Sequence, residues 1–116
     1  MIVCAIDDLI FSIKVSTAAK SLQTDVYFER SGEKLLDTIR DKRPSLVIFD
    51  LNSARLRPLD AIERLKRDPD LRDIRTLGYV SHVDTATIEA ARVAGIDQVM
   101  ARSAFVNQLG EILTTA

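Results

Sequence analysis

The stretch that decides the fold is PSLVIFDLN, residues 44–52. Its apolar residues run without a polar break from Leu46 to Phe49, so a strand built from them has no face suited to water. That pattern is typical of a central strand in a parallel sheet that helices cover on both sides. Asp50 follows the run directly, at the carboxyl end of the expected strand, where open α/β sheets place their ligand sites.

Outward from this stretch, short apolar runs alternate with segments of helical periodicity. Strands are expected at residues 2–6, 25–29, 44–52, 74–80 and 96–101. Helices are expected between and after them, with caps or first-turn residues at Ser31, Pro58, Asp84 and Ser103. Five βα units in a row predict an α/β fold of the flavodoxin-like, doubly wound kind, (βα)5, with a parallel sheet of order 2-1-3-4-5. We expect residues 1–116 to form one domain.

The helix expected over residues 9–22 carries more apolar side chains than one buried face requires. Phe11 and Val15 belong to one stripe, and Ile10 and Ile13 belong to a second. Two interpretations remain open: a helix wedged broadly into the core, or a helix whose second stripe contacts a partner protein.

Composition excludes several classes of protein. The chain has 16 basic and 17 acidic residues and a net charge of −1, which gives no general attraction to nucleic acid or membranes. Cys4 is the one cysteine, so no internal disulfide is possible, and we interpret it as a small buried apolar residue. No signal peptide is visible and no apolar run is long enough to span a bilayer, so a cytoplasmic protein is expected.

Acidic residues follow two of the expected strands. Asp7 and Asp8 end the first strand and Asp50 ends the third, and in a sheet of order 2-1-3-4-5 these strands are neighbours. Three carboxylates in one crevice repel one another unless a cation or protons intervene. Mg²⁺ prefers such oxygen ligands, and the backbone carbonyl of Asn52 could supply another. The simpler alternative is that these acids only begin loops or cap helices.

These motifs give the chain a resemblance to the receiver domain of response regulators in two-component signalling. The resemblance spans the whole chain and is carried by residues 6–8, 44–52, 68–69 and 94–97. It implies a receiver in a phosphorelay, in which Asp50 accepts a phosphoryl group from a histidine kinase or phosphotransfer protein. We expect this receiver to be stand-alone, because the sequence ends soon after its fifth expected helix. It also implies that Asp7, Asp8, Asp50 and the Asn52 carbonyl hold Mg²⁺.

Other positions depart from the family's pattern. Arg102 and Ser103 stand where the family typically has lysine and proline, and Val99 stands at its aromatic switch position. Val80 falls where the family has a threonine or serine, with Ser81 next to it. Two hypotheses therefore stay open: a phospho-accepting receiver with an altered switch in which Arg102, Ser81 and Val80 surround the phosphoryl group, or a pseudo-receiver that binds other signalling proteins without phosphorylation.

The sequence also carries expectations about partners and about enzymatic activity. The resemblance implies an output or homodimer surface containing Thr87, Arg92, Val99 and Val106. His82, the one histidine, is expected in a loop beside the crevice. Loops long enough for a substrate pocket are few, so we expect a signalling protein and not an enzyme. FMN binding is disfavoured because Asp7 and Asp8 would repel its phosphate.

Overall fold

The computed structural model describes residues 1–81 and 84–116. Its strands are β1 (Ile2–Ala5), β2 (Val26–Phe28), β3 (Leu46–Asp50), β4 (Arg75–Val80) and β5 (Gln98–Ala101). Its helices are α1 (Leu9–Ser21), α2 (Leu35–Lys42), α3 (Pro58–Arg67), α4 (Thr85–Ala94), α5 (Arg102–Asn107) and α6 (Leu109–Thr115). Strands and helices alternate as the sequence predicts, except that the last expected helix is divided in two.

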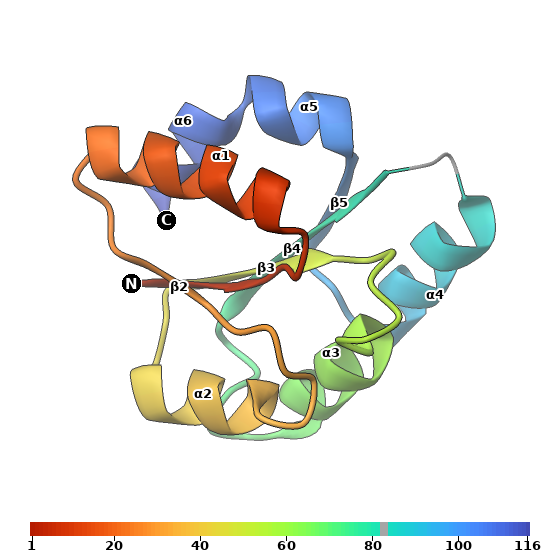
Figure 1. Cartoon of the computed structure of the whole chain (residues 1–116). Coiled ribbons are helices and arrows are strands. Elements are labelled where there is room, and N and C mark those ends of the chain that lie inside the picture. Colours follow the sequence, from red (N-terminus) through yellow and green to blue (C-terminus); the bar gives the residue numbers. More distant parts are fainter. Residues whose placement is uncertain (82–83) are drawn as a thin grey trace.

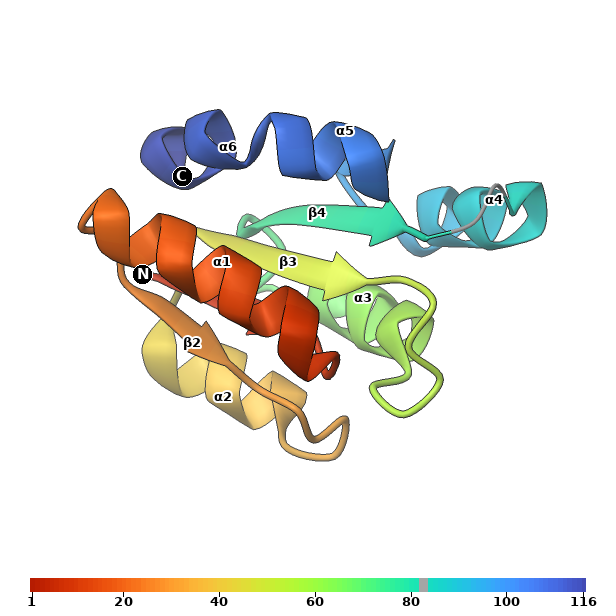
Figure 2. The ribbon, with the colours of Figure 1, turned by 45° about the horizontal axis from the view of Figure 1, so that its top comes forward.

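The strands form one parallel sheet of order β2-β1-β3-β4-β5, which confirms the predicted topology. β3 lies in its middle, paired with β1 on one side and β4 on the other. Figure 1 shows α1, α5 and α6 on one face of the sheet and α2, α3 and α4 on the other. The turned view in Figure 2 shows the same three layers.

Burial explains why residues 44–52 organise this sheet. Leu46 and Ile48 join the core under α1, α5 and α6, while Val47 and Phe49 join the core under α2, α3 and α4. All four side chains are at most 1% exposed, so an uninterrupted apolar run was required. Cys4 on neighbouring β1 is free and fully buried, as predicted, and burial raises the pKa of its thiol to about 12.

The predicted starts of α3 and α4 are confirmed. Pro58 is the first residue of α3, and the Asp84 carboxylate caps α4 by accepting a hydrogen bond from the backbone N–H of Thr87. Gly95 ends α4 in the left-handed conformation at φ 105°, a position that glycine tolerates without strain.

The predicted caps at Ser31 and Ser103 are wrong. The Ser31 hydroxyl accepts a 3.4 Å hydrogen bond from the Lys34 N–H in a turn before α2, which begins one residue later without a side-chain cap. Ser103 lies inside α5, because that helix follows β5 with no loop between them. The helix is interrupted at Gln108, which separates α5 from α6.

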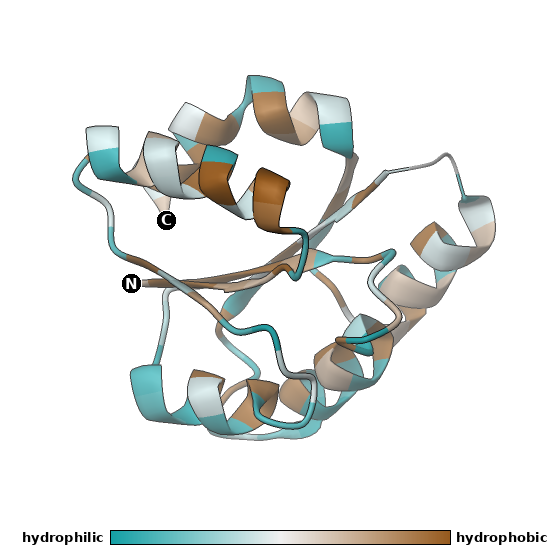
Figure 3. Ribbon diagram, in the orientation of Figure 1, coloured by the Kyte–Doolittle hydropathy of each residue, from teal (hydrophilic) through white to brown (hydrophobic). Residues whose placement is uncertain are grey.

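The two apolar stripes of α1 differ in burial. Phe11 and Val15 are buried, but Ile10 is 82% exposed and Ile13 is 65% exposed. Broad burial in the core is therefore wrong for the second stripe, and Figure 3 shows the first turn of α1 as strongly hydrophobic.

None of the helices in the described parts of the chain has the length and apolar character needed to cross a membrane.

A network of polar side chains holds the start of β5 beside the start of β4, at the amino ends of these strands. One Asp97 carboxylate oxygen accepts hydrogen bonds from Lys66 Nζ at 2.9 Å, from the Thr76 N–H at 2.8 Å and from the Thr76 hydroxyl at 2.9 Å. The Asp97 N–H donates back to that hydroxyl at 3.0 Å. The turn before β5 is thereby tied to α3 and to the first residues of β4.

Candidate functional site

The acidic crevice, which we define as Asp7, Asp8 and Asp50, lies at the carboxyl ends of β1 and β3. Ala5 of β1 is in register with Phe49 of β3, so the residues that follow them emerge at the same edge of the sheet. The charges of Asp7 and Asp8 both act on the pKa of Asp50, which places the three carboxyl groups within electrostatic reach of one another. Strand order therefore brings the charges of Asp7 and Asp8 to bear on Asp50, and a metal ion shared by the three carboxylates stays a prediction.

Asp50 is the half-buried member of the crevice at the end of the central strand. One of its carboxylate oxygens accepts a 3.0 Å hydrogen bond from the backbone N–H of Asn52. Burial raises its pKa above the ordinary value of 3.8, the Asn52 N–H lowers it, Asp7 raises it, Arg102 lowers it and Asp8 raises it, for a net increase. The negative charge of Asp50 is therefore incompletely compensated, which suits a carboxylate that bonds an electrophile or a cation.

Asp8 engages both of its carboxylate oxygens. Oδ1 accepts a 3.0 Å hydrogen bond from the backbone N–H of Phe11 and so caps α1. Oδ2 lies 3.6 Å from Nη2 of Arg102. The helix-cap alternative considered for Asp8 is correct as a local description, but the contact with Arg102 joins this residue to the far end of the chain.

Arg102 reaches the crevice from the first turn of α5. Its guanidinium carbon lies 4.1 Å from the centroid of the Phe11 ring, a cation–π contact. Phe11 itself is held by the rings of Tyr79 and Phe105, with centroids 5.0 and 5.9 Å away. Sequence reasoning placed Phe11 in the core but missed its role as a platform for Arg102; its signal was an aromatic residue three positions after the capping acid.

Asn52 contributes its side chain as well as the predicted backbone position. Its amide oxygen accepts a 2.6 Å hydrogen bond from the backbone N–H of Ser81. Val80 is the last residue of β4, in register with Ala101, and is 5% exposed in the core. Val80 therefore ends the strand as predicted, and Ser81 lies just beyond it.

The predicted switch residues gather around one hollow of about 560 Å³. Val80, Ser81, Val99 and Arg102 all line it. Two residues of the predicted partner surface, Arg92 and Val106, line it as well. Thr87 lies elsewhere, in a groove that also contains Asn52. The predicted partner surface is thus divided between two depressions.

The donor set of the acidic crevice fits a magnesium ion chemically, since carboxylate and carbonyl oxygens are the ligands this ion prefers. The arrangement is not preformed: within residues 1–81 and 84–116, no group of three or more histidine, cysteine or acidic side chains is positioned to hold a metal. Asp8 instead contacts the Phe11 N–H and the Arg102 guanidinium.

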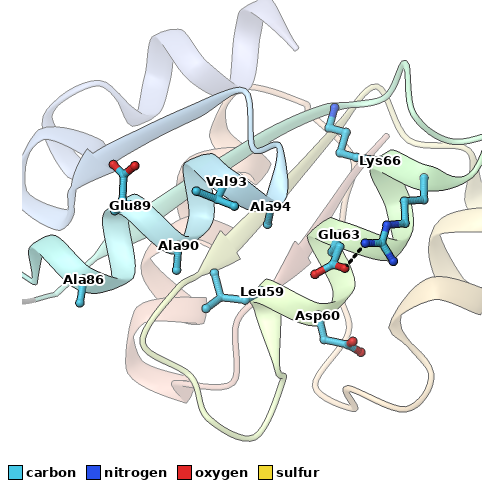
Figure 4. Close-up of a pocket in the computed structure, with 10 residues that line it drawn as sticks. Leu59, Asp60, Glu63, Lys66, Ala86, Glu89, Ala90, Val93 and Ala94 are labelled. Atoms are coloured by element: carbon cyan, nitrogen blue, oxygen red, sulfur yellow. Dashed lines mark ion pairs between the residues drawn. The ribbon is translucent and has the colours of Figure 1, made fainter.

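Two further features lie outside this arrangement. The structure has a groove between α3 and α4, where Leu59 faces Ala86 and Ala90 and where Glu63 pairs with Arg67 at 2.6 Å (Figure 4). None of its lining residues belongs to the acidic crevice, so it is no part of this site. The expectation for His82 lies outside the described residues.

Tyr79, opposite Asp50 in the sheet, is 1% exposed, and its hydroxyl has no hydrogen-bond partner among the described residues. Burial raises the pKa of this phenol, and the charge of Asp50 raises it further. The neutral phenol is therefore strongly favoured, and this residue serves the site through its ring, which stacks on Phe105 at 4.9 Å and supports Phe11.

Among known proteins, solved structures match this chain, whereas sequence comparisons do not. No family model matches the chain, and no curated protein matches it in sequence. The Mn(2+)-bound form of response regulator Rcp1 superposes with a TM-score of 0.84 at 17% identity, over 99% of this chain and 95% of that chain. The phosphorylated cyanobacterial phytochrome response regulator RcpA gives 0.82 at 20% identity, over 98% and 88%. A response regulator from Hahella chejuensis gives 0.86 at 12% identity, over 97% and 91%.

Proposed function

From a chain that has the receiver fold of response regulators, we propose a receiver-type signalling protein that accepts a phosphoryl group on Asp50. The observation that carries the proposal is the state of this carboxylate: half-buried, raised in pKa, and at the carboxyl end of the central strand beside two more acids. Transfer would form a bond from an Asp50 oxygen to phosphorus and break the bond from phosphorus to the donor atom. Because the acceptor is the protein itself, we propose no turnover of a free substrate.

The chain's own residues divide the work at this acceptor. The Asn52 N–H holds one Asp50 oxygen, and no other hydrogen bond to that carboxylate exists within the described residues. Arg102 brings a positive charge toward the place where phosphoryl oxygens would lie. Ser81, held by the Asn52 side chain, offers a hydroxyl at the rim. These groups would orient the phosphoryl group and compensate its charge.

Magnesium is the cation we propose for this crevice. Asp7, Asp8, Asp50 and the backbone carbonyl of Asn52 would hold it, and when bound it would neutralise charge on the transferring group. A matching structure of the same fold is described as Mn(2+)-bound, which supports a divalent ion in this fold.

A histidine kinase or phosphotransfer protein is the proposed phosphoryl donor. Leu9, Ile10 and Ile13 are 64%, 82% and 65% exposed on α1, next to the capping acid of the crevice. An exposed apolar surface of this kind favours contact with another protein. Its position would bring that protein's phosphorylated side chain toward Asp50.

A phosphorylation-independent pseudo-receiver is the second candidate, and the hollow beside β5 favours it. Val99 takes the place of an aromatic switch side chain there, and buried Val80 offers no hydroxyl to a phosphoryl group. In this alternative, the protein binds its partner through its surface without a change in phosphorylation, and Asp50 is not modified.

Beryllofluoride or acetyl phosphate with Mg²⁺ separates the two candidates. For the receiver, intact-protein mass spectrometry after acetyl phosphate shows the mass of one added phosphoryl group, and amide NMR signals near Asp50 move on adding beryllofluoride. Asp50→Asn abolishes both changes, whereas Asp73→Asn, which removes an exposed acid far along the chain, leaves them. Unmodified wild-type protein and unmoved signals at millimolar reagent would contradict phosphorylation and leave the pseudo-receiver.

A further inference from the structure

We propose that Arg102 is the built-in counter-ion of the acidic crevice and sets its affinity for divalent metal by holding the carboxylate of Asp8. The inference rests on the metal site in the proposed function and deepens it. It assigns to Arg102 a role in metal selection, in addition to any later contact with a phosphoryl group.

The first step is the state of Asp8. Its Oδ1 accepts from the Phe11 N–H at 3.0 Å, and its Oδ2 lies 3.6 Å from Arg102 Nη2. A metal ion that coordinates Asp8 must therefore share one of these oxygens with the helix cap or with the guanidinium, since each carboxylate oxygen has two lone pairs. The cap is local to α1 and forms with the helix, so the contact with Arg102 is the one that can be exchanged.

The second step is the anchoring of Arg102. The Asp8 and Arg102 side chains are 42% and 37% exposed, and an ion pair of this kind is weak by itself. Here the guanidinium also lies over the Phe11 ring, and that ring is 3% exposed and packed against Tyr79. The planar cation is thus held in place by a buried surface, which reduces the entropy lost in pairing with Asp8.

The third step is competition. Arg102 lowers the pKa of Asp50, so its positive charge acts on the acceptor as well as on Asp8. A divalent ion entering the crevice meets a like charge and an occupied ligand at the same place. The Arg102 charge therefore opposes metal binding while it stays beside Asp8, and the stack on Phe11 keeps the guanidinium near the crevice. The contact between the first turns of α1 and α5 becomes the element that metal binding alters.

Mn²⁺ binding measures this directly, with free Mn²⁺ followed by electron paramagnetic resonance at fixed ionic strength. Arg102→Gln removes the guanidinium charge and its pairing with Asp8. Arg75→Gln removes one charge from an exposed residue at the opposite end of β4, and it is the matched control for net charge. Arg102→Met keeps an unbranched side chain against Phe11, so it tests the same point if the glutamine variant folds poorly.

The expected result is Mn²⁺ binding about tenfold tighter in Arg102→Gln and Arg102→Met, from the repulsion between a single and a double charge a few ångströms apart near water. Arg75→Gln should stay within about twofold of wild type, since distant exposed charges are screened. A gain of less than about threefold over that control in both Arg102 variants overturns the role of Arg102 while leaving the metal site intact. Absence of saturable binding in every variant overturns the metal site and this inference together.

Discussion

The side-chain oxygen of Asn52 accepts a hydrogen bond of 2.6 Å from the backbone N–H of Ser81. This bond joins the loop after β3 to the segment after β4, two neighbouring strands of the sheet. The same Asn52 residue donates its backbone N–H to Asp50. One asparagine therefore links the candidate acceptor to the segment after β4 through two separate groups.

Replacing Asn52 by alanine should lower the free energy of unfolding by about 1 kcal/mol, the usual size of one hydrogen bond at a partly exposed position. Urea unfolding followed by circular dichroism measures it. Asn52→Asp keeps an acceptor for the Ser81 N–H, so it should retain more stability than alanine wherever its added charge is screened by salt. Equal losses in both variants at high salt would show that the bond to Ser81 contributes nothing.

Replacing Asp50 by asparagine should stabilise the fold near neutral pH. Burial, the largest cause, raises the pKa of Asp50 in the folded protein, and a carboxyl group whose pKa is higher folded than unfolded costs stability while it is ionised. The advantage of Asp50→Asn should shrink as pH falls through the folded pKa and vanish below the ordinary value of 3.8.

Unfolding midpoints in urea, measured from neutral pH down to about pH 3 for both proteins, give this difference. Asp73→Asn is the control, because the carboxylate it removes is exposed. An Asp50→Asn protein that is less stable than wild type near pH 7 would show that the Asp50 charge is compensated in the folded state.

Replacing Asp97 by alanine should cost about 2 kcal/mol, because the buried Thr76 N–H and the Lys66 ammonium lose a shared acceptor. Burial raises the pKa of Asp97, but hydrogen bonds from Lys66 and Thr76 together lower it below the ordinary value. The Asp97 contribution is therefore present above pH 3.8 and lost as pH falls through the lower, folded pKa.

A double-mutant cycle of Asp97→Ala with Thr76→Val, followed by urea unfolding, tests this network. The two losses should be non-additive, since the Thr76 hydroxyl donates a 2.9 Å hydrogen bond to the Asp97 carboxylate and each substitution removes it. Simple additivity would mean that the network observed between them does not stabilise the folded protein.

Replacing Gly78 by alanine should destabilise the fold by about 1–3 kcal/mol through overpacking. A Cβ at this position in β4 would lie 2.7 Å from a Leu51 methyl group and 2.8 Å from an Ile96 methyl group. Gly110→Ala is the matched control: apart from its chain neighbours and its own helix backbone, no atom lies within 4 Å of its added methyl group, and alanine favours helix, so it should gain up to about 1 kcal/mol. Thermal unfolding of the two variants should move in opposite directions.

Replacing Tyr79 by phenylalanine should raise the free energy of unfolding by about 1 kcal/mol, because a buried hydroxyl without a partner is costly. The ring and its stack on Phe105 are retained. Urea unfolding measures the change, and a loss of stability would show that the hydroxyl makes a favourable contact in solution.

The sequence predicts the arrangement of the backbone elements better than it predicts the contacts of their side chains. The apolar run before Asp50 required a strand buried on both faces, and regular alternation then led to the parallel sheet and its order. From that order came the expectation that the charges of Asp7 and Asp8 act on Asp50, which they do. These inferences succeeded because burial periodicity and chain connectivity are written locally along the polypeptide.

Tertiary packing alone decided what those acids contact. The stack of Arg102 on Phe11 and its pairing with Asp8 join residues from opposite ends of the chain, and no spacing in the sequence encodes it. The caps expected at Ser31 and Ser103 failed for a related reason, since helix starts depend on how neighbouring turns pack. Local pattern determines which face of an element is buried, whereas the partner of a polar side chain depends on rotamers and on distances between elements that only the folded chain sets.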